Sequence, residues 1–143
     1  MCYPDKILRG ISGKFVDEDG ILSGEAFQLD DVREDGFCEI SITWYENQES
    51  FDILMRQKKE GTEEIQFKYG AAEINRVDLD VYMKPHILNG YFKYERKPVA
   101  GNPYHGNFLV ANRIDKAKKW LIKARLATLG NVLIHSNPFV FSD

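Results

Sequence analysis

The chain has 143 residues, of which 43% are hydrophobic, 13% aromatic and 29% charged. This length and composition are typical of one folded globular domain over residues 1–143, and they exclude a disordered or fibrous chain. No apolar run reaches the roughly 18–20 residues of a membrane span, and the opening residues hold no apolar segment of signal-peptide length. We therefore expect a cytoplasmic domain without membrane contact.

The two halves of the chain differ in charge although the net charge is only −3. Residues 1–64 carry 16 acidic and 7 basic side chains, whereas residues 65–143 carry 6 acidic and 12 basic ones. Either the halves lie apart and form faces of opposite charge, or they interleave and their charges pair. The two cysteines, Cys2 and Cys38, lie far apart in the sequence, so we expect reduced thiols and no disulfide.

Two strands are predicted in the first third of the chain. Residues 24–29 fit a strand, and residues 37–44 fit one better because apolar and polar side chains alternate there. Asp35 and Gly36 form a tight-turn signal just before the second segment. The two strands are therefore predicted to pair as antiparallel neighbours.

Residues 47–59 fit two patterns. Asn47 is a suitable N-cap and basic residues gather at the other end, as in a helix. A strand is also compatible, because apolar residues alternate at Phe51, Ile53 and Met55. We favour the helix.

The second half predicts further strands and a short helix. Residues 65–74, 86–95 and 108–111 have strand patterns. Asn75, with Asp78 three residues later, resembles a helix start, and the helix is expected to run to about Met83 and to stop at Pro85.

Residues 112–130 form the clearest helix, with Asn112 as its cap and Gly130 at its end. One broad face carries apolar residues and is the predicted core face: Ile114, Ala117, Trp120, Leu121, Ala124 and Ala127. The predicted fold is α+β: an antiparallel or mixed sheet of about five strands, with this long C-terminal helix packed across it and one or two shorter helices.

The polar loop before residues 108–111 is the first candidate site. His105 can transfer a proton near neutral pH and Tyr104 can orient a substrate, so these two are the candidate catalytic residues. Asn102 and Asn107 can bind amide or phosphate oxygens, and Arg96 supplies positive charge. The alternative is structural: the loop is a turn that His105 holds by a hydrogen bond to the backbone.

The long helix is the second candidate site. Lys116, Lys119 and Lys123 share one stripe that could bind phosphates, although a solvated lysine face is the simpler interpretation. Apolar residues also continue on another side, at Ile122, Leu126 and Leu129, which we predict to be an interface with a partner.

Motifs of known chemistry are missing from the sequence. His86, His105 and His135 lack the close spacing of a metal site, and no nucleophile elbow or phosphate-binding glycine loop occurs. We expect no metal and no cofactor. The favoured function is a small non-catalytic interaction protein, an accessory or inhibitor-type subunit that binds another protein or a second copy. The alternative is a small metal-independent protein that binds or cleaves RNA through the His105 loop and the basic helix, so enzymatic activity stays open.

Overall fold

A computed structural model describes residues 3–29 and 32–134. Within these residues it has the predicted α+β fold, with an antiparallel sheet of six strands rather than about five. The strands are β1 (Lys6–Ile11), β2 (Phe37–Trp44), β3 (Gly70–Asn75), β4 (Phe92–Arg96), β5 (His105–Ala111) and β6 (Asn131–Ile134). The helices are α1 (Gln48–Arg56), α2 (Arg76–Leu88) and α3 (Lys116–Leu129), and short 3-10 turns lie at Gly13–Phe15 and Gly24–Ala26.

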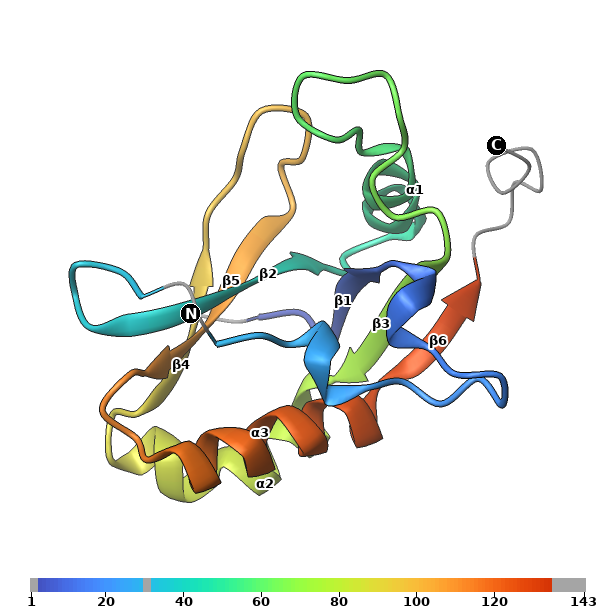
Figure 1. The fold of residues 1–143 in the computed structure, drawn as a ribbon. Helices are drawn as coiled ribbons and strands as arrows, with labels where there is room; N and C mark the ends of the chain where they lie inside the picture. The colour runs from blue at the N-terminus through green and yellow to red at the C-terminus, as the bar shows by residue number, and fades with distance from the viewer. Residues whose placement is uncertain (1–2, 30–31, 135–143) are drawn as a thin grey trace.

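The sheet is covered on both faces (Figure 1). Its strand order is β4-β5-β2-β1-β3-β6, with α2 and α3 on one face and α1 on the other. The main core lies under α2 and α3, where Leu126 and Met83 belong to the same buried cluster as Phe108 of β5. A smaller core under α1 joins Leu8 of β1 to Leu54. The two faces of the sheet are thus separate environments.

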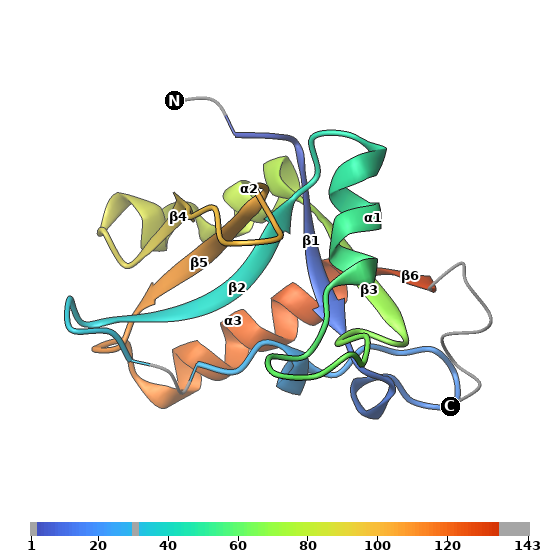
Figure 2. The ribbon, with the colours of Figure 1, turned by 90° about the horizontal axis from the view of Figure 1, so that it is seen from above.

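The sheet splits between its two central strands. β1 and β2 pair only at Ile7 with Trp44 and at Leu8 with Thr43. Beyond these pairs β1 stays with β3 and β2 stays with β5, so the two strands diverge (Figure 2). Backbone groups along the divergence lose their strand partner and need other hydrogen bonds. A crevice therefore opens in the middle of the sheet.

Helix starts follow the predicted caps in two of three cases. Asn47 caps α1 in a reciprocal capping box with Ser50, and the Asn75 side chain accepts from the backbone N–H of Asp78 at the start of α2. Pro85 does not end α2, which continues to Leu88. Because Pro85 lies in the last turn, it removes only one hydrogen bond near the helix end.

Helix α3 starts later than predicted. Its cap is Asp115, whose side chain accepts from the backbone N–H of Lys118. Asn112 instead lies before the helix, and its side-chain oxygen accepts from Lys119 Nζ at 2.7 Å. The cap position sets the start of the helix, while the side chains that face the sheet are decided by packing.

Three strand predictions are wrong, one of them entirely. Residues 24–29 contain a 3-10 turn and no strand, so they do not pair with β2, whose partners are β1 and β5. Residues 65–69 precede β3, and residues 86–88 belong to α2, so that β4 begins only at Phe92. The sequence patterns also missed β6 and β1. The reason is clear for β1, because Ile7 and Leu8 are buried on opposite faces and the polar side of an alternating pattern is lost.

The oppositely charged halves interleave. β1 and β2, from the acidic half, lie between β5 and β3 from the basic half. Ion pairs join the halves, among them Arg96 with Glu46 at 2.7 Å and Lys123 with Glu25 at 3.2 Å. The second of the two charge arrangements considered above is therefore the one the fold adopts.

Candidate functional site

The side chains of His105 and Tyr104 form hydrogen bonds with different parts of the structure. His105 begins β5, and its Nδ1–H donates to the carbonyl oxygen of Lys97 at 2.9 Å. Nε2 of the neutral ring is then an acceptor. The hydroxyl of Tyr104 donates to Glu49 on α1 at 3.2 Å. The pair does not form an acid and base couple around one substrate position, but the hydrogen bond from His105 matches the structural alternative for this loop.

The two loop asparagines are buried in the fold. Asn102 donates through Nδ2 to Thr43 Oγ1 at 3.0 Å and accepts the backbone N–H of Tyr104, so its side chain holds the turn. Asn107 is 1% exposed and donates to Glu95 at 2.9 Å, while its Oδ1 has no partner among the described residues. Neither amide is presented to solvent as a binding group.

The predicted cations do not share a cleft with His105. Arg96 pairs with Glu46 and lies over the rings of Tyr3 and Trp44. The stripe formed by Lys116, Lys119 and Lys123 belongs to α3, on the face of the sheet opposite to α1 (Figure 1). His105 faces the α1 side, where it lines a pocket with Leu54. The geometry required for RNA cleavage by these groups together is absent from the described residues.

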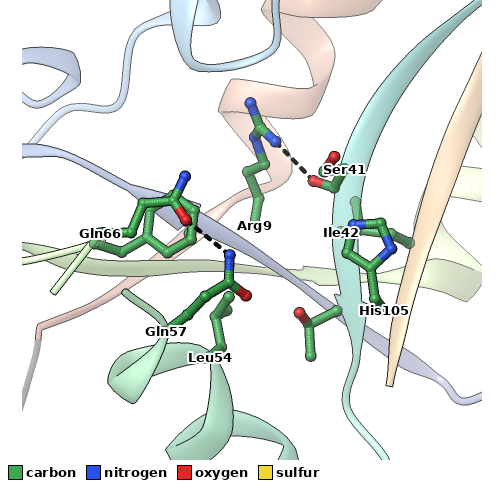
Figure 3. Close-up of a pocket in the computed structure, with 10 residues that line it drawn as sticks. Arg9, Ser41, Ile42, Leu54, Gln57, Gln66 and His105 are labelled. Carbon is green, nitrogen blue, oxygen red and sulfur yellow. Dashed lines mark hydrogen bonds between the residues drawn. The ribbon is translucent and has the colours of Figure 1, made fainter. Parts of the chain in front are cut away.

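His105 instead lines the crevice between β1 and β2 (Figure 3). The pocket has a volume of about 200 Å³ and its wall includes residues from both diverging strands, from α1 and from the segment before β3. The lining residues are Arg9, Gly10, Ser41, Ile42, Thr43, Leu54, Gln57, Gln66, Phe67 and His105. Most of them present polar groups to one small space.

Arg9 is the functional candidate that the sequence patterns missed. Its Nε donates to the carbonyl oxygen of Ala26 at 3.0 Å, and its Nη1 donates to that of Ser41 at 2.7 Å. The side chain thus supplies a hydrogen bond to β2 where β1 has moved away. The available signal was an arginine placed between the apolar residues Ile7, Leu8 and Ile11, because charged side chains are seldom found among residues that are expected to be buried.

The charge of Arg9 has no acidic partner among the described residues. Burial lowers the pKa of Arg9 to about 10, and no carboxylate within residues 3–29 and 32–134 opposes this shift. The group is still charged at neutral pH. Among the described residues Arg9 is thus a half-buried cation bonded to carbonyl oxygens alone, and its positive charge in the wall of the crevice is not compensated by them.

The prediction that Ile122, Leu126 and Leu129 form an exposed interface is wrong. Ile122 and Leu126 are 0% exposed in the main core, and Leu129 packs against that core. The centre of the predicted core face points outward instead, since Trp120 is 65% exposed and Leu121 is 51% exposed. Only the ends of that face meet the core: Ile114 is buried in it and Ala127 packs against it. Helix α3 is apolar on two sides, and the aliphatic side with Ile122 and Leu126 is the one that packs against the sheet.

We call the outward side of α3 the Trp120 face, formed by Ala117, Trp120, Leu121 and Ala124. Basic residues border it on both edges: Lys116 and Lys123 on one, Lys118 and Arg125 on the other. A groove of about 300 Å³ lies beside the indole and is lined by Leu29, Lys116, Lys119, Trp120 and Lys123. The face is apolar at its centre and positively charged at its edges.

The described residues contain no helix long and apolar enough to cross a membrane and no cluster of ligands that could hold a metal ion. Cys38 is buried in the core, while Cys2 and His135 lie outside the described residues. Comparisons of the chain with protein-family models, with curated proteins and with solved structures find no match.

Proposed function

We propose that the chain is a non-catalytic interaction protein that binds an acidic partner protein through the Trp120 face. The observation that carries this proposal is the 65% exposure of Trp120 beside a half-exposed Leu121. Tryptophan is enriched among residues that dominate binding energy, and such residues are surrounded by contacts that exclude water. An apolar centre with a charged rim is also the general arrangement of a protein interface.

The rim argues for an acidic partner in preference to a second copy. Lys116, Lys118 and Arg125 are exposed at the edges of the face. Two copies packed face to face around a twofold axis would oppose these cations to one another, and like charges across an interface weaken it. A partner with carboxylates around an apolar site would bury the apolar centre of the face and would also pair with the cations at its edges.

A second candidate is the binding of single-stranded RNA at the same face. The groove beside Trp120 is lined by three lysines, and an exposed indole can stack on a base while lysines neutralise phosphates. Two of these lysines are already engaged: Lys123 pairs with Glu25 and Lys119 donates to Asn112. The acidic protein partner is therefore the better supported candidate.

The test uses three variants of the whole chain. Proteins retained by the parent chain from its host would be identified, purified and titrated calorimetrically against Trp120→Ala, Leu121→Glu and Val99→Glu. The last is the control, since Val99 is an exposed valine in the loop after β4. We expect Trp120→Ala to weaken binding by about 30-fold, as for an interface hot spot, and Leu121→Glu to abolish it.

Two results would contradict the proposal. One is a partner that binds Trp120→Ala and Leu121→Glu as tightly as it binds the parent. The other is an absence of protein binding together with tight, salt-dependent binding of oligouridine that Trp120→Ala removes, which would establish the RNA candidate instead.

A further inference from the structure

The crevice between β1 and β2 combines a fixed positive charge with spare hydrogen-bond donors. A guanidinium has five N–H groups, and Arg9 uses two of them on the carbonyl oxygens of Ala26 and Ser41. Gln57 Nε2 donates to Gln66 Oε1 at 2.8 Å, which leaves the amide N–H groups of Gln66 for another acceptor. Hydroxyl groups of Ser41 and Thr43 line the same pocket. Three N–H groups of Arg9 and the two amide N–H groups of Gln66 therefore have no acceptor among the described residues.

A second groove continues from this pocket. It measures about 520 Å³ and shares four lining residues with the crevice: Arg9, Gly10, Gln66 and Phe67. Its other lining residues include Lys14, Lys59 and Lys68, and none of its described lining residues is acidic. Lys59 and Lys68 both approach the single carboxylate of Glu64, at 3.6 Å each. The combined surface therefore keeps an excess of positive charge.

Phe67 lines both spaces. A methyl group added at Gly10 would overlap the Phe67 ring, so the ring packs directly on the glycine. The crevice alone is smaller than the roughly 300–1,000 Å³ of pockets that enclose a drug-sized molecule. It fits a head group, while the groove past Phe67 offers room for the rest of a ligand.

We propose that the crevice binds the oxyanion group of a small molecule, a phosphate or a carboxylate, with Arg9 as the charged donor and Gln66 as a neutral one. The body of the ligand lies along the ring of Phe67 towards Lys14 and Lys68. Charge-assisted hydrogen bonds from a guanidinium to an oxyanion are the strong polar contacts of proteins, and the anion would compensate the half-buried charge of Arg9, which no carboxylate of the described residues balances. This site is independent of the Trp120 face.

The experiment is an NMR titration of the isotopically labelled chain with inorganic phosphate, with acetate and with phenyl phosphate. Sodium chloride at matched ionic strength is the reference. We expect saturable shifts of the Arg9 Nε–H and Gln66 side-chain amide resonances, and tighter binding of phenyl phosphate than of phosphate because the phenyl ring reaches Phe67. Saturation by phosphate alone or by acetate alone identifies which oxyanion the crevice selects.

Two variants and one control locate the site. Arg9→Gln should weaken binding by about tenfold or more, since it removes a charged donor. Gln66→Leu should weaken it less and does not disturb β1, so it tests the site even if Arg9→Gln fails to fold. Arg56→Gln removes an exposed arginine from α1 and should bind as the parent does.

The proposal is overturned if neither phosphate nor acetate gives saturable shifts at Arg9, or if the folded crevice variants bind as the parent does. Leu121→Glu should keep the parent affinity for phosphate, because Leu121 lines neither the crevice nor the groove that continues from it. Failure of the crevice site is thus distinguishable from failure of the protein-binding proposal.

Discussion

The crevice and the Trp120 face are built by opposite means. The crevice is polar, and the side chain of Arg9 is also part of the fold because it donates to two backbone carbonyls. The Trp120 face is apolar, and the exposed side chains of Trp120 and Leu121 are not part of the buried core. Substitution of Arg9 should therefore change binding and stability together, whereas substitutions on the Trp120 face should change binding alone.

The largest expected effect is the difference in stability between substitutions on the buried side of α3 and on its exposed side. Leu126→Glu should prevent folding, because it places an unpaired carboxylate at a position that is 0% exposed, and it also leaves the core underfilled. Leu121→Glu should leave the free energy of unfolding within about 0.5 kcal/mol of the parent. Circular dichroism with urea unfolding measures both. A folded Leu126→Glu variant would show that α3 is rotated from the orientation described.

The two tryptophans provide the next comparison. Trp44 is 0% exposed and stacks on Tyr3 with ring centroids 4.7 Å apart, so Trp44→Ala should cost about 3–5 kcal/mol. Trp120→Ala should cost less than about 0.5 kcal/mol. Acrylamide quenching of the single-tryptophan variants Trp44→Phe and Trp120→Phe measures the exposure directly. Equal quenching of the two indoles would remove the basis for the Trp120 face.

Substitutions at Gly10 and Gly13 test whether the Phe67 ring packs on Gly10 in the crevice. Gly10→Ala should cost about 1–3 kcal/mol, because the new methyl group must displace the Phe67 ring. It should also weaken phenyl phosphate binding more than phosphate binding. Gly13→Ala is the control: its methyl group would lie 3.5 Å from Tyr69, an ordinary contact. Equal stability of the two variants would show that Phe67 does not pack on Gly10.

The smallest expected effect concerns pH. Burial raises the pKa of Glu95, but hydrogen bonds from Asn107 and Arg33 outweigh it, and the net pKa lies below the ordinary 4.5. Because the folded pKa is depressed, the stabilisation is present above pH 4.5 and is lost as the pH falls through the folded pKa. Glu95→Gln should cost about 1 kcal/mol at pH 7 and flatten this acid dependence.

The matched variant for this pH effect is Glu63→Gln. Glu63 pairs with Lys58, which lowers its pKa, yet its side chain is 92% exposed and solvent screens the pair. The free energy of unfolding of Glu63→Gln between pH 3 and pH 7 should therefore follow that of the parent. A Glu95→Gln variant with the parent profile would mean that the hydrogen bonds of Glu95 with Asn107 and Arg33 contribute nothing measurable to the free energy of unfolding.

Local patterns in the sequence were sufficient for several elements. The alternation over residues 37–44 gives β2 with one buried face, and the Asn47 and Asn75 caps mark the starts of α1 and α2. These signals involve neighbours within one turn or one strand, so they do not depend on the rest of the fold. The α+β class follows from the same patterns.

The rest depends on contacts between distant residues. The sequence of α3 offers an aromatic side and an aliphatic side, and the shape of the core on the sheet decided that Leu126 points inward and Trp120 outward. The crevice exists because β1 and β2 separate after two residue pairs, which brings Arg9 and His105 to one pocket. No local pattern encodes that separation, since strand pairing is set by long-range packing and register. The sequence alone therefore determined the types of the elements, while only the tertiary structure decided which side chains line the two surfaces.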